Sequence, residues 1–219
     1  MIVVGTGTEV GKTHVCMCLL AQARARGLRV RAYKPVATGV TGECEDSARH
    51  AEALGTASVP PTFGYVRPVS PHLAAREEGR PIDLEAIARV ADEMTPGTDL
   101  LLVETAGGLF SPLSETLTNA DLVRRLGPAA VLLVAPDRIG VLGEVRAFSL
   151  AAQASGITLS WVVLSAPAQG DASTGTNAGE LEALGLGPVS PVFRRAPFDA
   201  KESLDAAARV LEALAPSIG

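Results

Sequence analysis

The chain is poor in aromatic residues and has no long hydrophobic run. Aromatic residues make up only 4% of its 219 residues although 47% are hydrophobic, so any core must consist mainly of alanine, valine and leucine. No apolar run approaches the roughly 18 residues of a membrane-spanning helix. Strand-like residues begin at Met1, which leaves no room for a signal peptide. We therefore expect a cytoplasmic protein with no membrane partner.

Cysteine is scarce as well, and it follows no metal-binding or redox pattern. Cys16 and Cys18 lie two apart in a helical pattern and would point to different faces, while Cys44 stands alone. The three histidines are scattered, and no two have the spacing of metal ligands. Buried thiols are the simplest interpretation, and the sequence predicts no transition-metal site.

The chain also lacks a block of basic residues. It has 19 lysines and arginines against 24 acidic residues, for a net charge of −5. This balance argues against a nucleic-acid partner and against a patch that binds anionic membranes. It does not exclude a phosphate site, because the positive field of such a site is local.

What the sequence does contain is a glycine- and threonine-rich segment at 5–13, GTGTEVGKT, which we call the phosphate loop. An apolar β-branched run at 2–4 precedes it and a helical pattern at 14–26 follows it. Backbone N–H groups of such a loop form an anion-binding concavity at the helix N-terminus. Lys12 would place its charge at the β- and γ-phosphates, and the Thr13 hydroxyl would bind Mg²⁺. The competing interpretation is a turn that contains Gly-Lys-Thr by chance.

Strand-like and helix-like segments alternate from one end of the chain to the other, without repeats or a long linker. The pattern predicts an α/β fold, doubly wound around a mainly parallel sheet flanked by helices, in a single domain over 1–219. A proline-rich stretch at 60–71 is expected to be irregular, and 169–179 to be a loop. Strands are expected at 2–4, 28–34, 99–104, 130–136, 158–165 and 188–193, and helices at 14–26, 46–54, 83–94, 119–126, 140–155, 180–184 and 203–214.

Two charged residues follow predicted strands. Pro35 favours an extended backbone at Lys34 and so fixes this lysine near the carboxyl end of its strand. Glu104 follows four aliphatic residues and precedes small residues that let a ligand approach the backbone. Ligands of open parallel sheets bind at this end of the strands. The alternatives are an ordinary exposed lysine and an acid placed at a strand end by chance.

Four segments together resemble the dethiobiotin synthetase family, from the deviant group of P-loop NTPases. They are the phosphate loop, KPVATG at 34–39, SPHLAAREEGRPI at 70–82 and VETAGGLFSPLSE at 104–115. The family's phosphate loop has the same extra residue between its glycines. The resemblance implies a P-loop NTPase-like fold and ring closure of 7,8-diaminopelargonic acid with CO₂ to dethiobiotin. ATP, or another nucleoside triphosphate, would be a substrate, Mg²⁺ a cofactor, and the protein a homodimer.

The resemblance also implies residue roles. Lys34 and Lys12 would be catalytic, and the partner's segment at 140–144 would hold the substrate carboxylate. Asp46 is chosen over the neighbouring Glu43 and Glu45 as a metal ligand. Nucleotide binding would involve Glu9, Val10, Gly11, Lys12, Thr13, His14, Asp46, Glu104, Thr105, Ala106 and Gly107; the metal would be held by Thr13, Asp46 and Glu104, and the diamine by Thr8 and Thr38.

Several positions depart from the family pattern. Gly7 stands where an aspartate is usual, and Thr105 replaces a glycine. Residues 164–166 replace the Asn-Asp pair that reads adenine, and 142–144 lack the usual asparagine. The preferred base and the acceptor amine therefore stay open, and a divergent paralogue acting on another amine is one alternative.

Two further alternatives remain. One is a nucleotide-switched ATPase that positions or regulates a partner, although residues 6–8 lack the second lysine that such proteins carry. The other is a family member that binds nucleotide without catalysis.

Overall fold

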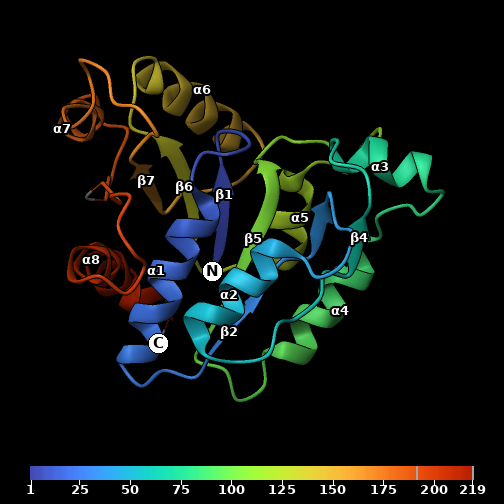
Figure 1. The fold of residues 1–219 in the computed structure, drawn as a ribbon. Coiled ribbons are helices and arrows are strands. Elements are labelled where there is room, and N and C mark those ends of the chain that lie inside the picture. Colours follow the sequence, from blue (N-terminus) through green and yellow to red (C-terminus); the bar gives the residue numbers. More distant parts are fainter. Residues whose placement is uncertain (191, 219) are drawn as a thin grey trace.

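Five parallel strands form the central sheet, in the order β2-β5-β1-β6-β7 (Figure 1). The computed structural model describes residues 1–190 and 192–218, the side chains of 215–218 excepted. Because β1 lies in the middle, the loop that follows it opens at the centre of the sheet's carboxyl edge. The strands are β1 (Ile2–Gly5), β2 (Val30–Tyr33), β5 (Leu100–Gly108), β6 (Val131–Pro136) and β7 (Trp161–Ser165).

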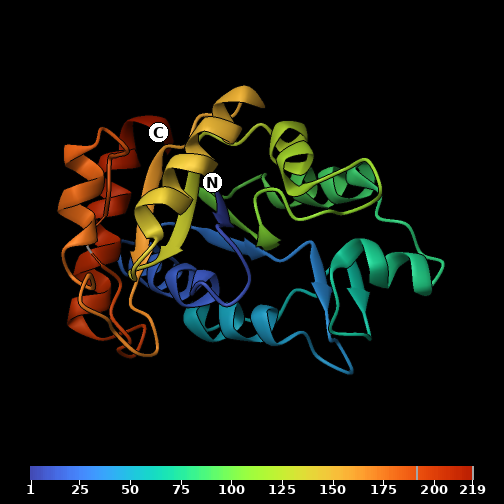
Figure 2. The ribbon, with the colours of Figure 1, turned by 90° about the horizontal axis from the view of Figure 1, so that it is seen from above.

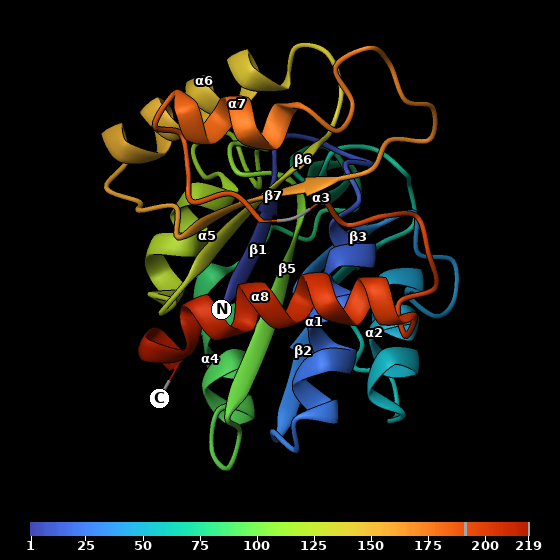
Figure 3. The ribbon, with the colours of Figure 1, turned by 90° about the vertical axis from the view of Figure 1, so that its left-hand side faces the viewer.

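Helices cover both faces of this sheet because successive strand residues point to opposite sides. Val3 packs into a core with α1, α2 and α8, whereas Ile2 and Val4 pack toward α3, α4 and α5. Figure 3 shows α8 crossing in front of the sheet beside α1. The helices are α1 (Lys12–Ala25), α2 (Glu45–Leu54), α3 (Pro71–Glu77), α4 (Leu84–Met94), α5 (Asn119–Leu126), α6 (Val141–Ala154), α7 (Asn177–Ala183) and α8 (Lys201–Ile218).

A second, two-stranded parallel sheet pairs β3 (Val36–Thr38) with β4 (Phe63–Tyr65). Seen from above, it lies with α3 to one side of the main sheet, and α8 lies on the other side (Figure 2). The expectation that 60–71 is wholly irregular was therefore wrong. Three-residue strands between prolines show too little alternation to be recognised in the sequence.

The predicted α/β class with a parallel sheet is confirmed, with corrections at several boundaries. Strand β5 continues to Gly108, so Glu104 lies within the strand instead of at its end. The strand expected at 188–193 is only partly formed: Val189 and Phe193 make isolated parallel bridges, and position 191 lies outside the described residues. Helix α7 begins at Asn177, inside the segment expected to be a loop.

None of the helices in the described part of the chain is both long enough and apolar enough to cross a membrane.

Candidate functional site

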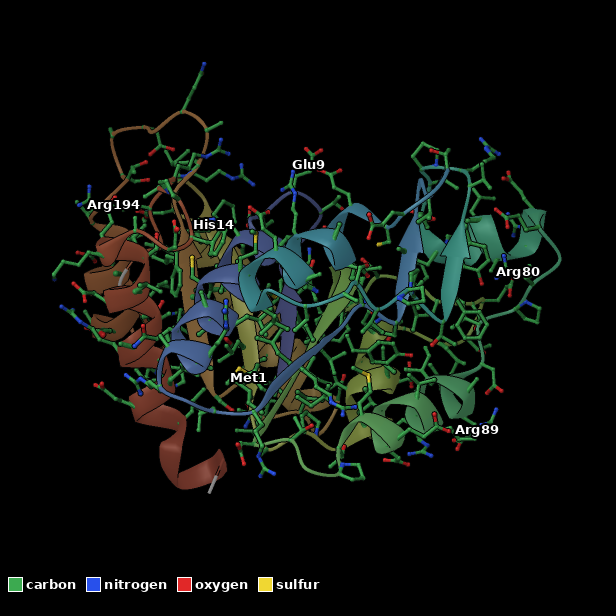
Figure 4. The ribbon with its side chains drawn as sticks, turned by 60° about the horizontal axis from the view of Figure 1, so that its bottom comes forward. Met1, Glu9, His14, Arg80, Arg89 and Arg194 are labelled. Atoms are coloured by element: carbon green, nitrogen blue, oxygen red, sulfur yellow. The ribbon has the colours of Figure 1, made fainter. Side chains whose placement is uncertain are left out.

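The phosphate loop joins β1 to α1 and adopts backbone conformations that glycine favours. Gly11 has φ +91°, and Glu9 is the one non-glycine residue with positive φ, at 58°, in the described chain. The Lys12 ammonium group donates to the carbonyl oxygen of Gly7 at 2.9 Å, so the side chain curls over the loop. Figure 4 shows Glu9 on the loop, at the edge of the molecule. The loop therefore surrounds a cation at the N-terminus of α1, as phosphate binding requires.

Next to the loop lies a compact group that we call the Lys34 cluster: Thr13, Lys34, Asp46 and Glu104. The Lys34 ammonium group lies 2.7 Å from Oε1 of Glu104 and 2.8 Å from Oδ2 of Asp46. The Thr13 hydroxyl lies 2.8 Å from Oδ1 of Asp46 and 3.0 Å from Oε1 of Glu104. Segments far apart in the sequence thus meet at one point: α1, the end of β2, α2 and β5.

The electrostatics of the Lys34 cluster follow from its burial. Burial opposes the charge of Glu104, but Lys34 and His50 outweigh it and hold the pKa of this carboxyl well below its usual range. Burial likewise opposes the charge of Lys34, while Glu104 and Asp46 raise its pKa above the ordinary value. Both groups are therefore charged at neutral pH, as an ion pair whose two residues are each 4% or less exposed.

For Lys12, burial and repulsion outweigh the nearby carboxylates, so its pKa falls instead of rising. Burial, followed by repulsion from Lys34, lowers the pKa of Lys12 to about 8. A phosphate anion bound against the loop would offset that repulsion and favour the charged form of Lys12.

Two residues that sequence reasoning missed stand behind Glu104. The His50 Nε2 atom lies 2.8 Å from Oε2 of Glu104, and His50 is 2% exposed. Cys16, fully buried on α1, has its sulfur within 4.8 Å of the His50 and Glu104 ligand atoms. Burial, with Glu104 next, raises the pKa of the Cys16 thiol well above its usual value. No sequence signal joins these residues, because they come from three separate segments.

A cavity of about 1030 Å³ opens over the phosphate loop and the Lys34 cluster. This volume is large enough for a nucleotide together with a small second substrate. Thr38 lines it from the end of β3. The other predicted residues that line it are Thr8, Glu9, Val10, Gly11, Lys12, Thr13, His14, Lys34, Asp46, Glu104, Ala106 and Gly107.

Thr105 is the predicted nucleotide-binding residue that does not line this cavity. Its hydroxyl donates to the carbonyl oxygen of Val3 at 3.3 Å, and the residue is buried. Only its carbonyl oxygen faces the cluster, where it accepts from Lys34 at 3.3 Å. The threonine that replaces the usual glycine is thus accommodated within the sheet.

Residues 165–168 and Arg195 also line the cavity, and the Arg195 guanidinium donates to the carbonyl oxygen of Ala166 at 3.3 Å. The resemblance placed the base-reading position at 164–166, whereas Arg195 was not predicted. Nearby, His14 Nε2 lies 3.0 Å from the Arg194 carbonyl oxygen, and Figure 4 shows the two residues side by side. Burial, the largest influence, lowers the pKa of His14.

The donor set beside the loop suits Mg²⁺. The Thr13 hydroxyl and the carboxylates of Asp46 and Glu104 are all oxygen donors, converging within 3.0 Å of the Thr13 oxygen. Hard oxygen ligands from one hydroxyl and one or two carboxylates, completed by substrate phosphates, are typical of magnesium sites. Glu45 also lines the cavity, but its side chain is 77% exposed and pairs with Arg49 instead of joining this set.

Comparison with known proteins gives two kinds of similarity. The family model described as "AAA domain" matches residues 1–195. The ATP-dependent dethiobiotin synthetase BioD of Caulobacter sp. (strain K31) is 41% identical over 176 residues, which cover 75% of this chain and 75% of that protein. BioD 1 of Escherichia coli (strain K12), with the same enzyme name, is 36% identical over 171 residues, covering 73% of this chain and 75% of that one.

Among solved structures, the cell division ATPase MinD of Pyrococcus furiosus has a TM-score of 0.59 at 16% identity, covering 98% of each chain. The MinC:MinD complex of Aquifex aeolicus contains a chain with a TM-score of 0.60 at 12% identity, covering 96% of this chain and 95% of that one. At such identities the likeness shows the fold alone.

Proposed function

This chain belongs to the dethiobiotin synthetase family, and on that premise we propose that it closes the ureido ring of dethiobiotin from 7,8-diaminopelargonic acid, CO₂ and ATP. The observation that carries the proposal is the placement of Lys34. Its ammonium group is buried between two carboxylates, next to a phosphate loop, in a cavity with room for both substrates.

The reaction makes an electrostatic demand that this site can meet. One amine of the substrate captures CO₂ as a carbamate, and a carbamate oxygen attacks the γ-phosphorus while ADP leaves. The second amine then attacks the carbamate carbon, and phosphate leaves as the ring closes. Two anions must meet in the first step, so cations fixed in place before the reaction lower its barrier.

Lys12 and Lys34 supply those cations in this proposal. Lys12 holds the β- and γ-phosphates from within the loop. Lys34, which lines the same cavity as the loop, would bridge the carbamate and the γ-phosphate with its ammonium group. Thr13, Asp46 and Glu104 would hold Mg²⁺, which offsets phosphate charge when bound.

The remaining roles follow from the family resemblance and from the lining of the cavity. Thr8 and Thr38, which line the cavity, would contact the diamine. Residues 165–168 and Arg195 form the wall against which the base would lie, in place of the family's Asn-Asp pair.

We also propose a homodimer in the cytoplasm, where ATP and Mg²⁺ are available. The exposed side chain of Ile139 directly precedes the 140–144 segment, and that of Leu150 lies further along α6; both would be covered by a partner. Sedimentation equilibrium measures the assembly, and a monomer at assay concentration would contradict it.

The decisive experiment is product formation from diaminopelargonic acid, bicarbonate and Mg²⁺ with ATP, CTP or GTP. We expect dethiobiotin with the native chain and a loss of turnover of about 10²-fold or more in Lys34→Ala, since a preorganised charge is removed. Lys201→Ala is the matched control, because the side chain of that lysine is 89% exposed and pairs with Asp205 on the surface of α8. Near-full turnover of Lys34→Ala would overturn the residue assignment. A rate of nucleotide hydrolysis that does not depend on the diamine would instead favour the switch ATPase or a paralogue.

A further inference from the structure

Glu104 is shared by two chemically different sets of neighbours. Its Oε1 atom faces Thr13 and Lys34, which belong to the oxygen-rich magnesium side. Its Oε2 atom faces the His50 imidazole at 2.8 Å. The Cys16 thiol, the His50 ring nitrogen and a Glu104 oxygen lie within 4.8 Å of one another, and all three residues are buried.

Helix geometry explains why the second set lies directly below the first. Cys16 follows Thr13 by three residues on α1, and His50 follows Asp46 by four on α2. Both spacings place two side chains on the same helix face, one turn apart. Since α1 and α2 pack together, the thiol and the imidazole form a layer one turn deeper than the hydroxyl and the carboxylate.

From this arrangement we propose a second metal site, in which Cys16 Sγ, His50 Nε2 and a Glu104 oxygen bind a thiophilic divalent cation such as Zn²⁺. Thiolate, imidazole and carboxylate are the ligands that zinc takes in proteins, whereas Mg²⁺ avoids sulfur. Tetrahedral zinc ligands lie roughly 3.5 Å apart, so the present spacing of 4.8 Å or less needs only small side-chain movements.

Binding would exchange protons for the cation. The Cys16 thiol loses its proton to solvent as the sulfur–metal bond forms. Without metal, His50 Nε2 donates to the Glu104 carboxylate at 2.8 Å, so it carries a proton. On binding this proton also leaves, the neutral ring keeps a proton on Nδ1, and the Nε2 lone pair goes to the metal. Metal affinity should therefore come with proton release.

The proposed site has a route to solvent on each side. Glu104 lines the main cavity, which holds the magnesium side. His50 lines a second cavity of about 590 Å³, whose walls come from β2, α2 and α4. Each cavity thus reaches one residue of the proposed site, and small side-chain movements would have to admit the cation.

A divalent cation in this site would share the Glu104 carboxylate with Lys34 and Mg²⁺, and its charge would weaken the hold of Glu104 on both. Zinc should therefore inhibit ring closure, a consequence that rests on the proposed function, whereas zinc binding itself does not. The site would make the activity of the enzyme depend on the concentration of free zinc and similar metal ions.

The test uses Co²⁺, which reports a cysteine ligand through a thiolate-to-cobalt absorption band. We expect the band in the native chain and in Cys18→Ser, and its loss in Cys16→Ser and Cys16→Ala. Cys18 is the matched control because it is equally buried on the same helix. His50→Gln should weaken Co²⁺ binding about tenfold or more. Absence of the band in the native chain, or its survival in both Cys16 variants, would overturn the proposal.

A second measurement follows turnover at fixed Mg-ATP with increasing Zn²⁺. Relative to its own turnover without zinc, Cys16→Ser should need about tenfold or more zinc for half inhibition. Equal zinc sensitivity in the two proteins would also overturn the proposal. If the cobalt band forms as expected but no dethiobiotin is made, the metal site stands and the proposed function fails.

Discussion

At the scale of single residues, the glycines of the phosphate loop differ in whether the surrounding structure has room for a Cβ atom. Gly11 has φ +91°, and a Cβ there would overlap the Ser165 hydroxyl. Gly7, where the family usually has aspartate, has no positive φ, and its Cβ would meet only Val10 at 3.8 Å. The two glycines of one loop thus differ in their tolerance of a side chain.

We expect Gly11→Ala to lose nucleotide binding and about 1–3 kcal/mol of unfolding free energy, because the positive φ becomes strained and Ser165 must move. Gly7→Ala should keep its stability within about 1 kcal/mol and still bind nucleotide. Urea unfolding and titration with a fluorescent nucleotide measure both. Equal loss in the two variants would contradict the distinction.

Residue identities were predictable where a motif has a fixed spacing. Lys12, Thr13 and Lys34 follow from the phosphate loop and from a strand end. Asp46 could be separated from its acidic neighbours only by family resemblance, and the structure places it against Thr13. His50 lay beyond sequence reasoning, because its partner Glu104 is 54 positions away. Such contacts depend on how helices pack on the sheet.

At the scale of elements, the segment at 169–179 is tied to the start of α6. Buried Asp137 accepts from the Asn177 amide at 2.8 Å and from the Gly175 N–H at 2.8 Å. The Thr174 hydroxyl donates to the Asp137 carbonyl oxygen at 2.9 Å. The sequence predicted a loop from its composition, but this anchor requires two segments to meet.

We expect Asp137→Ala to release this segment and to cost about 1–3 kcal/mol of stability, because a buried amide and an N–H group lose their acceptor. Hydrogen exchange at 171–177 should speed up relative to the native chain. Asp205→Ala is the control, since its carboxylate lies 56% exposed on α8. Unchanged protection at 171–177 would show that other contacts hold the segment.

Elements were predictable where they are long and periodic. The buried run of β6 and the amphipathic pattern of α4 gave their elements directly. Strands β3 and β4 have three residues each, and their pairing over 27 positions leaves no periodic signal. This small sheet carries Thr38, so the resemblance named that residue while the strand that holds it escaped prediction.

At the scale of the whole molecule, α1 belongs both to the site and to the core. Its first residues, Lys12 and Thr13, line the cavity, while its buried face packs with α8. Val210 on α8 is fully buried in that shared core. If the chain is one domain, as the sequence predicts, a change at Val210 and a ligand at the loop must act on the same unfolding transition.

We therefore expect Val210→Ala to lower the free energy of unfolding by about 2 kcal/mol through lost burial and a residual cavity. For a chain of this length that is roughly 4–8 °C in Tm. Mg-nucleotide at a hundred times its Kd should add about 2.7 kcal/mol to native and variant alike, because it binds only the folded chain. Val66→Ala is the control, because Val66 is 58% exposed and contributes little to the core.

Two probes measure this transition. Far-UV circular dichroism follows the helices, and Trp161 fluorescence follows β7 at the edge of the sheet. Coincident curves that shift together with nucleotide are the expected result, since the P-loop helix links both regions. Two separate transitions, only one of them sensitive to nucleotide, would mean that the chain folds as more than one unit and that α8 does not stabilise the site.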